Sequence, residues 1–186
     1  MHQPKNIAGW PNNTYALGAG TAMAVHDYEM DPNVVNNPAY SGQVRTGLLS
    51  IPTMSLVLNK ADFWDLYDGD LEHPTSVEMF YPDGTKEQFD CGLQSHSSDR
   101  LKRALTLSFS ASTTTNMFRK TPFNSASVTN SFKNTKIVLR AGNNRSWARN
   151  WNPDRTCYTR DEWYRESQQS ISGVGGRGTF VHLYVN

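Results

Sequence analysis

The densest group of reactive side chains lies in residues 158–166, where the spacing of charged and aromatic residues fits an α-helix. At about 100° per residue, Asp161 shares a helix face with Cys157 and Tyr164, whereas Glu162 lies about 100° away. An acid on the inward face of a helix needs a cationic partner, because an unpaired buried charge is costly. Asp161 is therefore predicted to form an ion pair.

Structural explanations compete with a functional one in this segment. Thr159-x-x-Glu162 has the spacing of a capping box, which would account for Glu162 without any ligand. Asp161 and Arg165 are four residues apart and would equally form an ordinary surface pair. Arg160 has the charge to hold a phosphate or to pair with a neighbouring acid. The segment predicts a helix that starts near Thr159 and leaves the partner of Asp161 open.

A second polar group follows the apolar strand predicted at residues 136–141. Arg140 lies at the end of this strand, where it runs into Gly142-Asn143-Asn144. Glycine and asparagine are common in turns because they tolerate positive φ, so turn chemistry alone explains these residues. Aromatic residues gather nearby and would form either the edge of the core or a sugar-stacking platform. They are Trp147, Trp151, Tyr158, Trp163 and Tyr164.

The composition excludes partners that are bound through a strong charge field. The 18 Lys and Arg residues are balanced by 17 Asp and Glu residues, so we expect no nucleic-acid partner and no anionic membrane partner. No apolar run is long enough to predict a membrane span, and no leader segment is visible. Cys91 and Cys157 lack zinc or redox spacing, so two separate thiols are expected, with one disulfide as the alternative.

The elements that must position these residues follow from apolar periodicity. Residues 1–49 read as an irregular lead-in with short helices at 32–49, interrupted near Asn37-Pro38. Residues 50–186 form the second part, with a helical turn at 60–67, a turn at Pro82-Asp83-Gly84, a long polar loop at 110–134 and one substantial helix near 156–170. Strands are predicted at 51–58, 76–81, 87–93, 103–109, 136–141 and 179–186. The fold class is therefore α+β, a mainly antiparallel sheet with one packed helix.

The order of these pieces resembles the CotH family, named for spore coat protein H, whose members have a protein-kinase-like fold. The first matching residues are Asp27-Tyr28-Glu29-Met30-Asp31-Pro32, Ile51-Pro52-Thr53-Met54-Ser55-Leu56, Pro74-Thr75-Ser76-Val77-Glu78, Pro82-Asp83-Gly84, Cys91-Gly92-Leu93 and Lys102-Arg103-Ala104-Leu105. The strongest matches are Leu139-Arg140-Ala141-Gly142-Asn143-Asn144, Tyr158-Thr159-Arg160-Asp161-Glu162 and Val181-His182-Leu183-Tyr184-Val185-Asn186. The resemblance covers residues 27–186, and the shared order of the motifs is more specific than any one of them.

The resemblance implies that the chain is the N-terminal part, equivalent to the N-lobe, of an atypical protein kinase. Such a protein transfers the γ-phosphate of ATP to a protein hydroxyl with Mg²⁺ or Mn²⁺. The chain ends within an apolar strand, and the family's metal-binding and catalytic acids lie further downstream. We therefore expect a piece of a larger domain that is inactive alone, with no catalytic or metal-binding residue of its own. The family also suggests a bacterial protein outside the cytoplasm or on the cell surface.

Kinase chemistry places a strand lysine on the nucleotide phosphates and holds it with a helix acid. Lys102 opens the strand at 102–109 and shares its face with the small Ala104 and Thr106, which leaves room for a nucleotide. Arg103 lies on the opposite face, and an ordinary basic pair at a strand start is the competing explanation. The predicted cofactor-binding residues are Lys102, Arg103, Asp161 and Arg140.

One departure from the family pattern favours a different function. Relatives carry a glycine-bearing turn after the Gly-Leu pair, where backbone amides can approach phosphate closely. Here residues 94–100 contain no glycine. The alternative function is a non-catalytic surface or binding module for protein or carbohydrate that retains the fold.

Overall fold

The computed structural model describes residues 14–16, 23–25, 30, 32–68, 71–96, 103–109, 135–142, 157 and 159–185, with only the backbone described at 14–16, 23–25, 60, 64, 67, 68 and 135. The chain divides into two compact units, Met1–Ser50 and Ile51–Asn186. Lys102 and the polar loop predicted at 110–134 lie outside the described residues.

The described part of the first unit consists of short elements. Two strands that the sequence did not predict, β1 (Thr14–Ala16) and β2 (Met23–Val25), pair in antiparallel fashion. The predicted helices are confirmed as α1 (Pro32–Val35) and α2 (Ser41–Ser50), and neither has a buried residue. They are interrupted at Asn37, whose side-chain oxygen accepts a hydrogen bond from the amide of Ala39 at 2.9 Å. Asn-Pro favours such a turn because both residues fit it better than a helix interior.

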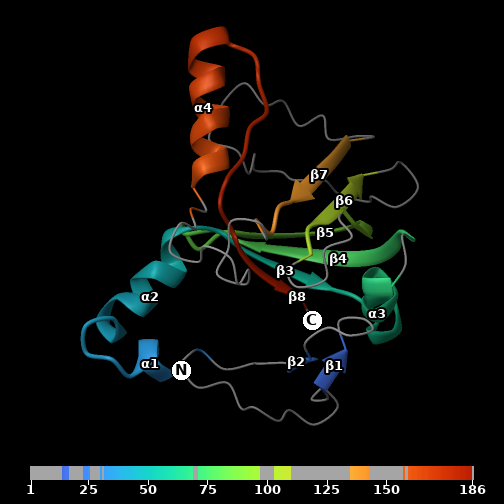
Figure 1. The fold of residues 1–186 in the computed structure, drawn as a ribbon, viewed down its shortest axis with the longest axis horizontal. Helices are drawn as coiled ribbons and strands as arrows, with labels where there is room; N and C mark the ends of the chain where they lie inside the picture. The colour runs from blue at the N-terminus through green and yellow to red at the C-terminus, as the bar shows by residue number, and fades with distance from the viewer. Residues whose placement is uncertain are drawn as a thin grey trace. The chain divides into compact units, whose positions relative to one another are not determined.

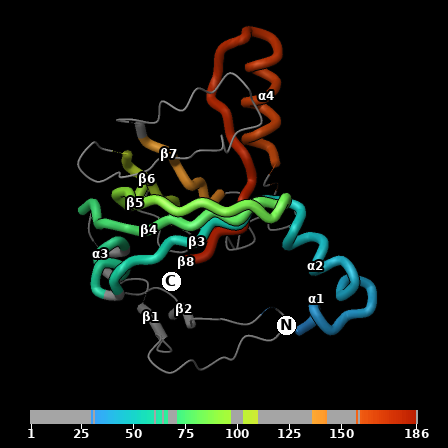
Figure 2. The backbone as a smooth tube through the Cα atoms, turned by 180° about the vertical axis from the view of Figure 1, so that it is seen from behind, coloured from blue at the N-terminus to red at the C-terminus, as the bar shows by residue number. Residues whose placement is uncertain are grey.

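The second unit is built on a curled, mixed six-stranded sheet (Figures 1 and 2). Its strands are β3 (Thr53–Val57), β4 (His73–Phe80), β5 (Lys86–Ser95), β6 (Leu105–Phe109), β7 (Thr135–Leu139) and β8 (His182–Val185). They are arranged in the order β7-β6-β5-β4-β3-β8. All neighbouring pairs are antiparallel except β3 and β8, which run parallel. The six predicted strands and the α+β class are confirmed.

Alternating residues of the sheet form the core on one face. Leu56, Val77 and Phe89 lie side by side across β3, β4 and β5, and Leu93 pairs with Leu107 across β5 and β6. This two-residue period is expected for a sheet with one covered face. The buried apolar residues are Met54, Leu56, Leu66, Val77, Met79, Phe89, Cys91, Leu93, Leu105, Leu107 and Phe109.

Three local features complete the frame of the second unit. The predicted turn joins β4 to β5, with Gly84 at φ 81° donating its amide to the Tyr81 carbonyl at 2.9 Å. Helix α3 (Lys60–Asp68) is capped by the Asn59 side chain and buries Leu66 against the core. Helix α4 (Arg160–Ser172) follows β7 and ends at Gly173, which has φ 71°. Both helices were predicted, α3 as a helical turn at 60–67 and α4 as the substantial helix near 156–170.

Candidate functional site

The contact between β7 and α4 brings together two of the four predicted cofactor-binding residues. Arg140 directly follows β7, and Asp161 lies in the first turn of α4. Their side chains form an ion pair, with 2.7 Å between the guanidinium Nε and the carboxylate Oδ2. The Arg140 side chain is 62% exposed and that of Asp161 is 35% exposed. Asp161 therefore has a cationic partner, as predicted, and that partner is Arg140 rather than Arg165.

The inward-facing acid of α4 is Glu162, so the expectation that Asp161 occupies that face is wrong. Glu162 is the only buried residue among the described side chains of α4. Its Oε2 accepts hydrogen bonds from Arg165 Nε at 3.0 Å and Nη2 at 2.9 Å. A Cβ on Gly178 would lie 2.1 Å from the same Oε2, so the segment before β8 passes directly over this carboxylate. This close approach of the backbone explains why Glu162 is buried, whereas Asp161, the residue before it, is not.

The predicted capping box is not formed. Thr159 is the N-cap residue of α4, as the spacing indicated, but its side chain makes no capping hydrogen bond. Its hydroxyl instead lies 3.4 Å from the sulfur of Cys157. The Glu162 carboxylate accepts hydrogen bonds from Arg165. In a capping box it would instead accept one from the backbone amide of the N-cap residue.

A pocket of about 410 Å³ opens beside this first turn of α4. It combines a thiol, a hydroxyl, a guanidinium, two carboxylates and two aromatic rings. The lining residues are Cys157, Thr159, Arg160, Glu162, Trp163, Glu166 and Phe180. Since Glu162 is already paired with Arg165, the other lining groups are the two aromatic rings, the neighbouring Cys157 thiol and Thr159 hydroxyl, and the charged side chains of Arg160 and Glu166. Such a surface suits a ligand with one apolar face and polar groups that meet the charged side chains.

The two cysteines are free thiols with opposite character. The hydrogen bond with the Thr159 hydroxyl lowers the pKa of Cys157, and the backbone amides of Thr159 and Arg160 and the Arg160 charge act in the same direction. Burial raises the pKa of Cys91 to about 12, with the nearby Asp90 and Glu72 carboxylates adding to the effect. Cys157 is therefore the more nucleophilic thiol at neutral pH.

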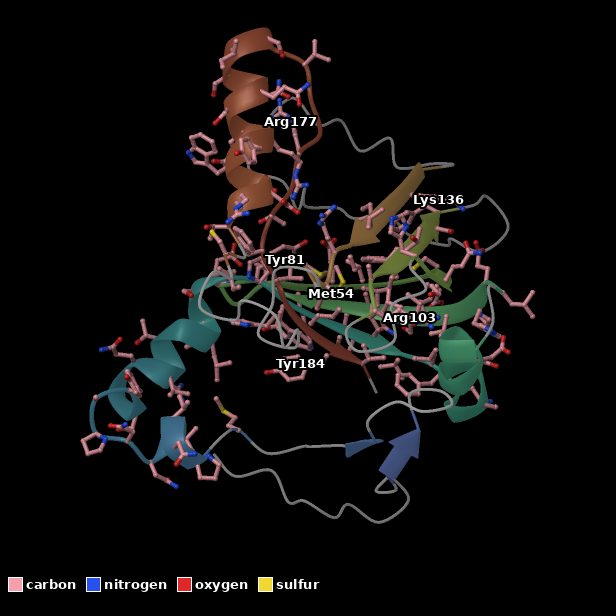
Figure 3. All side chains as sticks on the ribbon, in the orientation of Figure 1. Met54, Tyr81, Arg103, Lys136, Arg177 and Tyr184 are labelled. Atoms are coloured by element: carbon pink, nitrogen blue, oxygen red, sulfur yellow. The ribbon has the colours of Figure 1, made fainter. Side chains whose placement is uncertain are left out.

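Arg103 has a different position from Arg140 and Asp161. Its Nη1 donates to the Leu66 carbonyl in α3 at 2.8 Å and to the Ser95 hydroxyl at 2.9 Å. Figure 3 labels Arg103 on the side of the sheet where α3 lies. A cation near the last carbonyls of a helix stabilises that helix end. Arg103 thus connects β6 to α3.

Two features of the structure were missed in the sequence. His73 at the start of β4 contacts both Asp62 and Asp65 of α3. Gly178 provides the close approach to Glu162. The glycine-rich run at residues 173–178 could have indicated the close approach to Glu162, because glycine permits the backbone to pass close to another group. No comparable signal marked His73, whose partners lie in another element.

The fold and site define an α+β protein with a curled mixed sheet, few helices and a polar contact between β7 and α4. Comparison with protein-family models, curated proteins and solved structures found no match to this chain. Among the residues that the structure describes, no three His, Cys, Asp or Glu side chains are grouped so as to hold a metal ion. None of the described helices is long and apolar enough to cross a membrane.

Proposed function

We propose that residues 27–186 form the nucleotide-holding part of a CotH-type atypical protein kinase. The complete protein would transfer the γ-phosphate of ATP to a protein hydroxyl with Mg²⁺ or Mn²⁺. The observation that carries the proposal is the 2.7 Å ion pair between Arg140 and Asp161. Kinases hold nucleotide phosphates with a strand cation that a helix acid orients, and this pair joins a strand end to a helix in the same way.

Arg140 is suited to bind phosphate while it remains paired. A guanidinium carries five N–H donors, and Asp161 engages the Nε side of Arg140. Because 62% of the side chain is exposed, its remaining donors are accessible to an anion. Lys102 is proposed as the second cation. Arg103 would join them only by leaving its two present acceptors, Leu66 and Ser95.

The test is nucleotide binding by residues 1–186, measured by calorimetry with ATP and Mg²⁺ or Mn²⁺. Arg140→Gln should weaken binding by roughly 10–100-fold, because a charge-assisted hydrogen bond contributes about 1.5–3 kcal/mol. Asp161→Asn should weaken it less, since it removes the orienting partner and leaves the cation. Arg45→Gln is the matched control, because it removes the same charge from an exposed position in α2.

Two results would contradict the proposal. One is wild-type protein that binds no nucleotide with either metal, and the other is equal affinity for Arg140→Gln and Arg45→Gln. We expect binding without turnover, because the residues that match the family do not include its metal-binding acids. Metal-dependent ATP hydrolysis by residues 1–186 would contradict that part of the proposal.

A second candidate function is a non-catalytic module that binds a protein or carbohydrate. It is favoured by the exposed aromatics at the start of α4, where Trp163 is 62% and Tyr164 is 61% exposed. Their rings stand edge to face with centroids 5.1 Å apart, and Phe180 also lines the pocket. Exposed aromatic rings are typical of sugar and protein contacts. Loss of glycan or protein retention in Trp163→Ala, with ATP binding absent, would favour this function. Under either function we propose a bacterial protein located outside the cytoplasm or on the cell surface.

A further inference from the structure

Strand β8 forms one edge of the six-stranded sheet and, among the residues that the structure describes, has a neighbouring strand on one side only (Figure 1). It runs parallel to β3, where the His182 amide donates to the Pro52 carbonyl at 2.9 Å. Along an extended strand, the N–H and C=O groups of successive residues point to opposite sides. His182 and Tyr184 therefore direct these groups toward β3, whereas Leu183 and Val185 direct theirs away from the sheet.

The side chains of this edge are apolar or aromatic, and two of them are accessible. Leu183 is 40% exposed and Tyr184 is 46% exposed. Leu183 is aligned with the buried Met54 and so lies on the core face, while Tyr184 lies on the other face. Val181 and Val185 pack against the core on the face of Leu183. A strand added along this edge would therefore extend both the hydrogen bonding and the apolar face of the sheet.

The two edges of the sheet differ in charge. Strand β7, at the opposite edge, carries the exposed Lys136, and a charged side chain on an edge strand discourages pairing with another chain. Residues 178–186 contain no Lys, Arg, Asp or Glu. Figure 3 labels Lys136 and Tyr184 at these two edges. The β8 edge therefore lacks the charge that would repel a second copy of itself.

We propose that β8 pairs in antiparallel fashion with β8 of a second copy of this chain, which joins the two sheets across a two-fold axis. The register with the greatest overlap places Leu183 opposite Leu183 of the second copy. Val181 then lies opposite Val185, and His182 lies opposite Tyr184. The outward N–H and C=O groups of residues 181, 183 and 185 exchange hydrogen bonds in pairs, and apolar side chains meet across the axis on the core face.

A second copy suits this edge better than an unrelated strand for two reasons. The segment is its own complement in this register, because Val181, Leu183 and Val185 meet the same three residues in reverse order. A two-fold interface also closes, so it uses both free edges and produces a dimer rather than a fibre. The contact is short, so the dimer should be weak and reversible. This inference does not depend on the proposed function, because it concerns only the edge of the sheet.

The test is sedimentation equilibrium of residues 1–186 at concentrations from about 5 to about 500 µM, a range that covers weak protein contacts. The mass should rise from that of one chain toward that of two and no further. Leu183→Lys should weaken dimerisation at least about tenfold, because it places two like charges opposite each other. Val138→Lys is the matched control at the β7 edge, where Val138 is 43% exposed, and should behave as wild type.

A mixing experiment tests the register. Leu183→Lys and Leu183→Glu should each stay monomeric at concentrations where the wild type dimerises, and should form a mixed dimer when combined, because the opposed charges then differ in sign. A wild-type chain that stays monomeric throughout, or that assembles beyond a dimer, would overturn the proposal. Equal dimerisation of wild type and Leu183→Lys, loss of dimerisation in Val138→Lys, or the absence of a mixed dimer would also overturn it.

A measurement on the unmodified protein covers the case in which a variant fails to fold. Hydrogen exchange of the Leu183 and Val185 amides should slow at least about tenfold between dilute and concentrated protein, because these amides gain acceptors in the dimer. The Tyr184 amide already faces β3 and should show no such change. The same concentration dependence at all three amides, or none at any of them, would overturn the pairing.

Discussion

Replacement of Gly178 by alanine tests whether the close approach to Glu162 holds α4 in place. A Cβ at this position would lie 2.1 Å from Glu162 Oε2 and 2.8 Å from its Cδ, so the carboxylate must move. The Glu162 side chain is 11% exposed and receives two hydrogen bonds from Arg165. Gly178→Ala should therefore separate Glu162 from Arg165 and loosen α4.

The magnitude follows from two opposing effects. Loss of hydrogen bonds to a largely buried carboxylate costs about 1–3 kcal/mol. Alanine in place of glycine stabilises the folded state by about 0.4–1 kcal/mol, because it restricts the unfolded chain. This gain applies at Gly178, since its backbone does not need positive φ. The net change should be a destabilisation of about 1–2 kcal/mol in the opening free energy of α4, measured by hydrogen exchange of its amides.

Gly175 supplies the matched control in the same segment. A Cβ there would meet the Gln168 side chain at 3.5 Å, an ordinary contact. Gly175→Ala should therefore be neutral or stabilise by up to about 1 kcal/mol. In a Glu162→Ala background, Gly178→Ala should no longer destabilise, because the clashing group is gone. Equal effects of the two glycine substitutions, or a full cost in the Glu162→Ala background, would refute the reasoning.

Three further predictions concern other parts of the second unit. A thiol reagent at pH 7 should label Cys157 at least about tenfold faster than Cys91. The reason is that the pKa of Cys157 is lowered, whereas burial raises the pKa of Cys91 to about 12. Mass spectrometry of the labelled peptides measures the two rates, and equal rates would contradict the prediction. Leu107→Ala should lower the free energy of unfolding by about 2–5 kcal/mol in urea titration, because Leu107 is fully buried. Leu107→Met should lower it by less than about 1.5 kcal/mol. A similar loss for both variants would argue against a close-packed core. Gly84→Ala should destabilise the β4–β5 hairpin by about 1–2 kcal/mol through positive φ alone, because the added Cβ meets nothing within 4 Å. Gly84→Asn should destabilise it less. A larger loss of thermal stability for Gly84→Asn than for Gly84→Ala would contradict the explanation.

Local patterns were sufficient to predict the six strands of the second unit but not how all of them pair. Leu105, Leu107 and Phe109 alternate along β6 and occupy one face, as their spacing indicated. Thr106 and Ser108 on the other face are also buried, which alternation with polar residues does not reveal. The parallel pairing of β8 with β3 depends on segments more than a hundred residues apart. Contacts at that separation leave no periodic mark on either segment.

The candidate site shows the same division between local and distant information. The sequence indicated that Asp161 needs a cation, since an inward acid without one is costly. It left open which arginine serves, because Arg165 is near in sequence and Arg140 is near only in the folded chain. Arg103 was predicted to bind the cofactor, whereas the structure shows its guanidinium on the Leu66 carbonyl of α3 and the Ser95 hydroxyl. Its two acceptors belong to other elements and could not be inferred from the strand itself.

Helical spacing alone does not determine which of the two acids, Asp161 or Glu162, is buried. Two acids in the first turn are equally favourable for the helix dipole, so local energetics do not separate them. The helical-face argument assumed that α4 packs its Cys157–Tyr164 face inward, yet Tyr164 is largely exposed. What covers α4 is the returning segment, which contacts Gln168, Arg165 and Glu162 through its glycines. The absence of a side chain at Gly178 therefore buries Glu162, and Asp161 is left at the side of the helix where it meets Arg140.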